Sequence, residues 1–407
     1  MELNYKIKFL LRDTVFKLLV LNMIWVILGY ALASGVGFHL VPFIRVFKLI
    51  FVIGSLVFVL YRNGIDTGFL SKKWSILLVT LGVSVLAFVA EDPFPALYKS
   101  LTFVYPLIYI LFSINYLLRY EAFNLLVALS LSILLVYSFV PISYFLFGTD
   151  TGTANIYGHQ EGDFFVSNHY GWGSSLFILS ALTVLRFYPL KFYIKLGLFL
   201  YLPFVFYLLI ISGNRAGILS VALALVFFIF KDHFANISTK IILVFVAIAV
   251  YFFVAIQENS VIDFLQEKNK TQLETGKEGR LIGTEAMLRS FNSKKTFWIT
   301  GVGMFDYTEL RMNGGILYSY HNSYWEVLFG AGIIVFLFFL YYMVIHPLGI
   351  FWRLTSSYSL LIIPLIIIPL FESNLTAGQF LFFPWFAYMI LMNSKEFEYY
   401  SNIKQNE

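Results

Sequence analysis

Long apolar runs dominate this chain and limit what it can fold into. A helix that crosses the hydrocarbon core of a bilayer needs about 20 mostly apolar residues, and runs of this kind recur along the whole sequence. Of the 407 residues, 59% are hydrophobic and 13% are charged, whereas soluble domains carry about 25% charged residues. Such a chain cannot cover itself with a water-soluble surface, so we expect an all-α, polytopic membrane protein.

Twelve runs qualify as candidate membrane spans. They cover residues 14–34, 41–60, 74–90, 101–118, 124–146, 169–185, 196–212, 216–230, 241–256, 323–345, 357–372 and 378–392. An even number of spans places both termini on one side of the membrane. If that side is the cytoplasm, its seven segments hold fifteen Lys and Arg, whereas the short loops opposite hold only Lys99 and Arg215. Because cytoplasmic loops are enriched in Lys and Arg, this asymmetry predicts that both termini are cytoplasmic.

The spans divide the chain into three parts. Residues 1–256 form spans one to nine, 257–322 form one large hydrophilic loop, and 323–407 form spans ten to twelve and a cytoplasmic tail. The loop holds eight Lys or Arg and eight Asp or Glu, so it is dense in charge but nearly neutral. Its residues 266–291 have a helix-like pattern, and the following "ITGVGMFDY" carries two glycines suited to a tight turn. The orientation places this loop on the outer side of the membrane, opposite the cytoplasm.

Several kinds of chemistry are excluded by what the sequence lacks. Without cysteine there are no disulfides and no thiolate metal sites. No phosphate-binding P-loop motif occurs. The six histidines are scattered, and no pair has the helical spacing of a metal site, so we expect neither a metal nor another cofactor. The formal net charge of +5 does not indicate a nucleic-acid partner, because in a membrane protein the location of the charges matters more than their sum.

Cations next to the outer ends of the spans are the first candidate site residues. Arg215 ends a three-residue turn, Gly213 to Arg215, between two apolar runs in "LIISGNRAGILS"; it is either a snorkelling arginine at a helix end or a ligand for a charged group. Arg280 and Arg289 lie nine residues apart, which puts them on opposite sides of one helix, so both cannot face one ligand unless the helix breaks. A solvated charged face is the alternative reading, and it fits Arg289 better than Arg280. Arg45 and Lys48 lie one turn apart and share a face. They suit an anionic headgroup, and ordinary phospholipid contacts explain them equally well.

Polar residues also open the tenth span, in "YHNSYWEVLFGAG". Asn322 or Ser323 is expected to cap the helix, which leaves His321 available for another role. Glu326 lies one turn inside the span, and an ionisable group at that depth usually faces the bundle interior or a water-filled cavity. There it could orient His321 or pair with an arginine such as Arg215.

Together these residues could move a chemical group from a membrane-anchored phosphate ester to an alcohol. Arginine suits bidentate contacts with phosphate oxygens, and a histidine can take the proton from a hydroxyl group. Arginines that stabilise the charge of the leaving group make a metal unnecessary.

Three local patterns resemble the O-antigen ligase and polymerase family of bacterial envelopes. They are "SGNRAG" at 212–217, "GRLIGTEAMLRSF" with "WITGVGMF" at 279–305, and "YHNSYWEVLFGAGIIVFLFF" at 320–339. Their order and sidedness also agree with the family, and so does the twelve-span layout with one large loop.

The resemblance implies a GT-C-like fold and metal-independent, inverting glycosyl transfer at the periplasmic face of the bacterial inner membrane. The implied donor is a glycan on undecaprenyl diphosphate. Arg215 and Arg280 would bind the diphosphate, and His321 would activate the acceptor hydroxyl. The acceptor would be another lipid-linked repeat unit in a polymerase, or lipid A core in a ligase. We favour a polymerase of O-antigen or capsule-type repeat units, because each polysaccharide needs its own; a chain-length regulator is then a candidate partner.

Two alternatives come from other classes of protein. A transporter also fits twelve spans with cytoplasmic termini, but transporters carry paired broken helices in their two halves. We find no such pair, although Pro364 and Pro369 interrupt span eleven, and a transporter has little use for a loop as large as 257–322. A scaffolding protein is disfavoured by the intramembrane Glu326 and by the grouped cations.

Overall fold

The computed structural model has only helices as regular elements in the part of the chain that it describes. The described residues are 2–22, 41–64, 74–91, 93–138, 142, 167–212, 214–231, 287–289, 291–292, 295–304, 322–353, 357–371 and 379–393. The expected all-α class is therefore confirmed. In lipid, a backbone must satisfy its own hydrogen bonds, and a helix does so within each apolar run.

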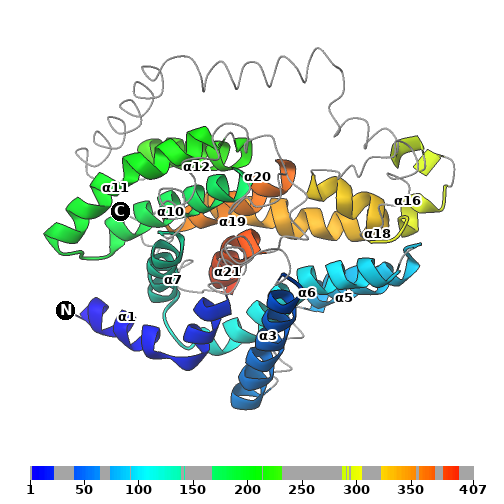
Figure 1. Cartoon of the computed structure of the whole chain (residues 1–407), viewed down its shortest axis with the longest axis horizontal. Coiled ribbons are helices and arrows are strands. Elements are labelled where there is room, and N and C mark those ends of the chain that lie inside the picture. The colour runs from blue at the N-terminus through cyan, green and yellow to red at the C-terminus, as the bar shows by residue number, and fades with distance from the viewer. Residues whose placement is uncertain are drawn as a thin grey trace, which may run out of the picture.

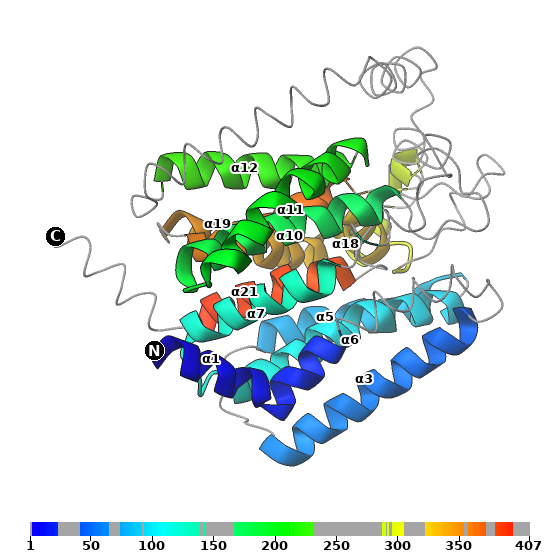
Figure 2. The same cartoon turned by 60° about the vertical axis from the view of Figure 1, so that its left-hand side comes forward.

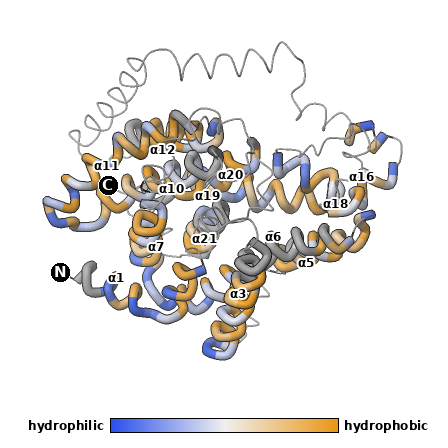
Figure 3. Tube along the Cα trace, in the orientation of Figure 1, coloured by the Kyte–Doolittle hydropathy of each residue, from blue (hydrophilic) through white to orange (hydrophobic). Residues whose placement is uncertain are grey.

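The helices form one bundle (Figure 1). They are α1 (Glu2–Arg12), α3 (Val41–Asn63), α5 (Trp74–Leu86) with η2 (Ala87–Val89), α6 (Pro93–Leu117), α7 (Ala122–Tyr137), α10 (Ser167–Phe187), α11 (Phe192–Ile211), α12 (Arg215–Lys231), α16 (Phe297–Thr300), α18 (Ser323–Leu340), the π-helical η3 (Tyr341–Ile345), α19 (His346–Arg353), η4 (Ser357–Ile362), α20 (Ile363–Phe371) and α21 (Gln379–Asn393). Hydrophobic residues cover most of their length, and hydrophilic residues gather near the helix ends (Figure 3).

α10 lies at the centre of the bundle. It packs against α7, α11 and α12, and both views place it between them (Figures 1 and 2). Two of its hydroxyl groups bond to the helix itself: Ser175 donates to the Trp172 carbonyl at 2.8 Å and Thr183 to the Leu179 carbonyl at 3.0 Å. Such bonds satisfy polar side chains where no water reaches them.

Each expected span that the structure describes coincides with helix. Two helical stretches, Phe192–Ile210 and Ser323–Phe351, are long and apolar enough to cross a membrane by length and composition. The tenth span differs from its expected range of 323–345. The helix turns sharply at Gly332, so that the rings of Tyr324 and Phe339 meet with centroids 5.6 Å apart, and η3 and α19 continue its second part to Arg353. Residues 241–256 and most of 14–34 lie outside the described part, so the twelve-span layout stays a prediction.

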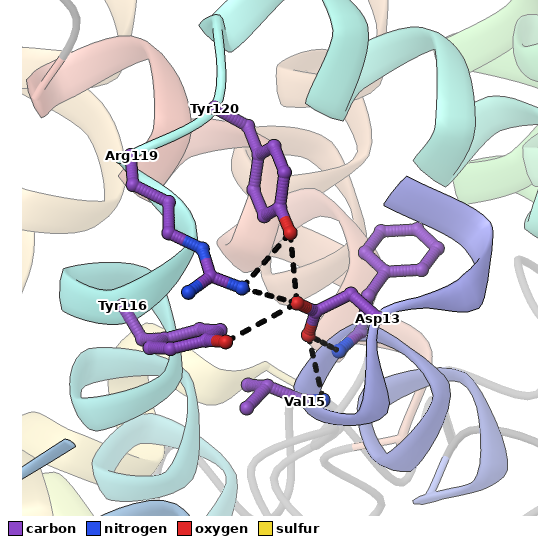
Figure 4. Close-up of polar contacts among 6 residues, drawn as sticks. Asp13, Val15, Tyr116, Arg119 and Tyr120 are labelled. Carbon is purple, nitrogen blue, oxygen red and sulfur yellow. Dashed lines mark hydrogen bonds and ion pairs between the residues drawn. The ribbon is translucent and has the colours of Figure 1, made fainter. Parts of the chain in front are cut away.

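A polar cluster joins α1 to the corner between α6 and α7 (Figure 4). Asp13 lies directly after α1 and accepts a hydrogen bond from the Val15 amide at 2.8 Å. Its other oxygen accepts hydrogen bonds from the hydroxyls of Tyr116, at 3.2 Å, and Tyr120, at 2.8 Å, and pairs with Arg119. The Arg119 guanidinium lies 3.6 Å from the centre of the Tyr116 ring. We call Asp13, Tyr116, Arg119 and Tyr120 the Asp13 clamp.

Candidate functional site

Asn322 connects two helix ends at the start of α18. Its side-chain oxygen accepts hydrogen bonds from the amides of Tyr324 and Trp325, at 2.9 and 3.2 Å. Its side-chain nitrogen donates to the Leu370 carbonyl at 3.0 Å, close to the end of α20. One amide group thus satisfies orphan groups at the N-terminus of one helix and the C-terminus of another. The prediction of a cap at this position is confirmed, and Asn322 provides it.

The first turn of α18 is held on α20 by a second bond. The Tyr324 hydroxyl donates to the Ile366 carbonyl at 3.2 Å. With the bond from Asn322 to Leu370, this contact sets both the position and the rotation of α18 where the chain leaves His321. Our sequence analysis did not single out Tyr324, because an aromatic residue at a membrane span end is ordinary.

Glu326 lies one turn inside α18 and is 1% exposed. It faces the interior of the bundle, as predicted. A carboxyl group in the first turn of a helix is favoured by the helix dipole. A buried ionisable group among membrane helices is a functional candidate by default.

The start of α12 is built around Asn214. Its side-chain oxygen accepts a hydrogen bond from the Gly217 amide at 2.6 Å, and its own amide donates to the Ser212 hydroxyl at 3.3 Å. Asn214 therefore caps α12, and Arg215 is the first residue of that helix. The side chain of Arg215 lies outside the described part of the structure.

The Asn214 turn packs directly on α10. A Cβ atom at Gly171 would lie 2.2 Å from the Asn214 Cβ, and one at Gly217 would lie 2.8 Å from the Gly171 carbonyl oxygen. Only glycine permits so close an approach between the two backbones. Gly171 thus helps to position the helix start that carries Arg215. The "GWG" at 171–173 was the available signal, and our sequence analysis did not use it.

The large loop touches α18 through residues 287–292. The residues described in this stretch are helical, with Met287 and Phe291 buried and Arg289 exposed. The rings of Phe291 and Phe329 meet edge to face with centroids 5.0 Å apart. The apolar side of this short helix therefore packs on α18, and Arg289 lies on its exposed side.

The structure describes the predicted site residues unequally. Asn322, Glu326 and Arg289 are described with their side chains, and all three lie on or beside the first half of α18. Arg45 and Lys48 are placed in α3 by their backbone only. His321 and Arg280 lie outside the described residues, so their predicted roles stay predictions. No group of three or more His, Asp or Glu that could hold a metal occurs in the described portion.

A family model described as O-antigen ligase matches residues 196–340. The matched region runs from α11 to the end of α18. It includes the Asn214 turn, the large loop and the helix start at Asn322, which are the places of the three patterns noted in the sequence. No curated protein matches the chain. The match to residues 196–340 supports membership of this chain in the O-antigen ligase/polymerase family of membrane glycosyltransferase-like enzymes.

Proposed function

We propose that this protein is an inverting, metal-independent glycosyltransferase that polymerises lipid-linked repeat units of the O-antigen or capsule type. The observation that carries the proposal is the pair of asparagine-capped helix starts inside the matched region. Arg215 is the first residue of α12, and in the sequence His321 directly precedes Asn322 and lies five residues before the buried Glu326. Both starts are fixed by hydrogen bonds to the side chain of the cap.

The start of α12 supports a role in binding phosphate. The first amides of a helix and its dipole favour an anion at this end, and the first residue of this helix is an arginine, Arg215. In the proposed reaction, Arg215 and Arg280 stabilise the departing undecaprenyl diphosphate. Arg289, Arg45 and Lys48 are further cations for the anionic donor or its surrounding headgroups.

The chemical step needs one base. His321 takes the proton from the acceptor hydroxyl, whose oxygen forms a bond to the anomeric carbon of the donor glycan. The bond between that carbon and the diphosphate oxygen breaks, and the electron pair leaves with the undecaprenyl diphosphate. A single displacement of this kind inverts the anomeric configuration. Glu326 tunes or orients the site, and Asn322 positions the backbone beside His321.

The proposal includes the location of the enzyme. The apolar runs predict twelve spans, and the asymmetry of Lys and Arg between the two sides favours cytoplasmic termini. The site and the loop 257–322 then face the periplasm of a bacterial inner membrane, and a chain-length regulator is a candidate partner. A ligase that transfers the polymer to lipid A core is the second candidate, favoured by the description of the matching family.

The test uses purified protein in detergent with an undecaprenyl-diphosphate-linked repeat unit as the only substrate and EDTA in the buffer. A ladder of longer lipid-linked glycans on a gel is expected. His321→Ala and Arg215→Ala should abolish the ladder, whereas Lys8→Ala, at an exposed position of α1, should leave it unchanged. Transfer only after addition of lipid A core would identify a ligase. Inactivity with both acceptors, or full activity of His321→Ala, would overturn the proposed mechanism.

A further inference from the structure

The large loop returns to α18 at a junction made of backbone. The Val302 amide donates to the Phe329 carbonyl at 2.8 Å, and the Gly303 amide donates to the Gly330 carbonyl at 3.1 Å. In an unbroken helix both carbonyls would accept from amides four residues later. Gly332, with φ 76°, interrupts the helix there. The loop therefore supplies the donors that the interrupted helix lacks.

Four glycines make this contact possible, and we call them the glycine junction: Gly301, Gly303, Gly330 and Gly332. A Cβ atom at Gly332 would lie 2.1 Å from the Ile299 carbonyl oxygen, and one at Gly301 would lie 2.3 Å from the Gly330 carbonyl oxygen. The backbones are thus in direct contact, with no side chain between them. The junction fixes α16 beside residue 332.

The same break marks a change in the surroundings of the helix. Before it, residues 323–331 are buried, except for the partly exposed Trp325. After it, helix continues through η3 and α19, and residues 332–351 number about 20, which matches the hydrocarbon thickness of a bilayer. If residues 332–351 cross the hydrocarbon core, residue 332 lies at the boundary between hydrocarbon and headgroups, and residues 323–331, which turn back from it at Gly332, lie beside the later part of the helix. α16 lies at the same depth, because the glycine junction holds it there.

Exposed apolar side chains form continuous stripes that lead to α16. One stripe follows the helix after Gly332: Ile334, Leu337, Tyr341, Ile345 and Leu348. A second follows α5 and η2, which pack beside α18: Leu81, Val85 and Phe88. α16 lies at the far end of α18 and α5 in Figure 1. Its own exposed side chains include Trp298 and Ile299, which are 37% and 60% exposed, so the apolar surface continues onto the loop.

Polar residues border this surface on the loop side. Lys295 and Thr296 precede α16 and are exposed, as is Arg289 on the preceding helical stretch. A tryptophan beside apolar residues and next to lysine is typical of a segment at the membrane interface. The aromatic ring reaches the upper acyl chains, and the cation stays among the phosphates.

We propose that α16 is a membrane anchor, in which Trp298 and Ile299 insert into the acyl-chain boundary of the leaflet next to residue 332. The occupant of this apolar face is the bilayer itself, because the exposed apolar side chains of α18 and of α5 lead toward α16, which the glycine junction holds beside them. The anchor holds the large loop down on the membrane surface. Its insertion does not depend on the proposed transfer reaction. That the leaflet is the periplasmic one, where a lipid-linked donor presents its diphosphate, rests on the proposed function.

The absence of cysteine permits a direct test by single-cysteine labelling. Ile299→Cys, Ile334→Cys and Asn292→Cys are each labelled with the fluorophore NBD in the full-length protein and reconstituted into phosphatidylcholine and phosphatidylglycerol vesicles. Ile334 is the position expected in hydrocarbon, and Asn292 is the exposed position expected in water. Emission is measured with nitroxide-labelled acyl chains and, separately, with aqueous iodide.

The label at position 299 should be quenched by the lipid nitroxide at least half as strongly as the label at 334, and should be protected from iodide. Quenching by iodide to the same degree as position 292 would overturn the anchor. Protection from both quenchers would also overturn it, because a second protein copy would then cover α16. Variants are compared only if they elute from gel filtration with the unlabelled protein. These readings are independent of the glycan ladder, so failure of the anchor and failure of the proposed reaction can be told apart.

Discussion

The glycine junction and the Asp13 clamp join distant parts of the chain in opposite ways. The junction uses backbone amides and carbonyls, and its glycines let the backbone of residues 301–303 approach the backbone of α18. The clamp uses a carboxylate, two phenols and a guanidinium, all on side chains. The two lie at opposite ends of the bundle (Figure 1). A backbone junction has no group that titrates and no room for a Cβ atom, whereas a side-chain clamp tolerates new side chains and responds to pH.

The clamp shifts the pKa of its carboxyl group. Burial of Asp13 raises the pKa, but hydrogen bonds from the Tyr120 hydroxyl and the backbone amides of Val15 and Phe16, with the charge of Arg119, outweigh burial and hold the pKa below its ordinary value of 3.8. The charged form of Asp13 is therefore stabilised by the fold. No comparable dependence on pH is expected from the hydrogen bonds of the glycine junction.

The largest effect is expected at the junction. Gly303 has φ 119°, and its Cβ atom would lie 2.5 Å from the Ala90 Cα. Gly303→Ala therefore adds backbone strain of about 1–3 kcal/mol and pushes the loop away from η2. We expect a lower temperature of aggregation in detergent, measured by gel filtration after heating. Gly349→Ala in α19 is the control, because nothing lies within 4 Å of its added Cβ; equal losses in both variants would contradict the close approach.

Removing the negative charge of Asp13 should lower the stability of the protein. Asp13→Asn removes a buried charged acceptor, which costs on the order of 2 kcal/mol. Because the folded pKa is lowered, the contribution of the carboxylate is complete above the unfolded pKa of about 3.9 and is lost as the pH falls through the folded pKa. The difference in thermal stability between wild type and variant should thus stay constant from pH 7 to about 5 and shrink below about 4. A difference that grows on acidification would refute this account.

An intermediate effect is expected where a side chain bonds to backbone. Asn322→Ala removes the cap of α18, which costs about 1 kcal/mol, and the bond to the Leu370 carbonyl. Asn322→Asp keeps the acceptor for the amides of Tyr324 and Trp325 and loses only the donor. Its thermal stability should lie between those of wild type and Asn322→Ala. If both variants lose the same stability, the cap itself contributes little.

The smallest effect is expected beside the clamp. Lys6 pairs with Glu121 at 2.8 Å, and these side chains are 41% and 50% exposed. Exposed pairs are worth about 0–1 kcal/mol, so Lys6→Ala should shift thermal unfolding within experimental error. A loss as large as that of Asp13→Asn would mean that the clamp extends to this pair.

The sequence predicted the helices well, for a physical reason. A run of about 20 apolar residues can only be a helix in lipid, because nothing else satisfies its backbone. The cap at Asn322 and the interior position of Glu326 were also predictable, since each follows from local chemistry. The break at Gly332 was not. Glycine alone within an apolar run does not end a helix. The break is stabilised by the amides of Val302 and Gly303, which donate to carbonyls of α18 and come from a different part of the chain.

The sequence by itself determined the all-α class, the places of the helices and the residue types of the site, because these depend on interactions within a few turns. The tertiary structure alone decided that Asp13 meets Arg119, that Gly171 supports the turn before Arg215, and that α16 lies beside residue 332. These contacts join residues far apart in the chain. No periodicity within one helix specifies its partner, because the free energy of such contacts exists only once the helices have packed.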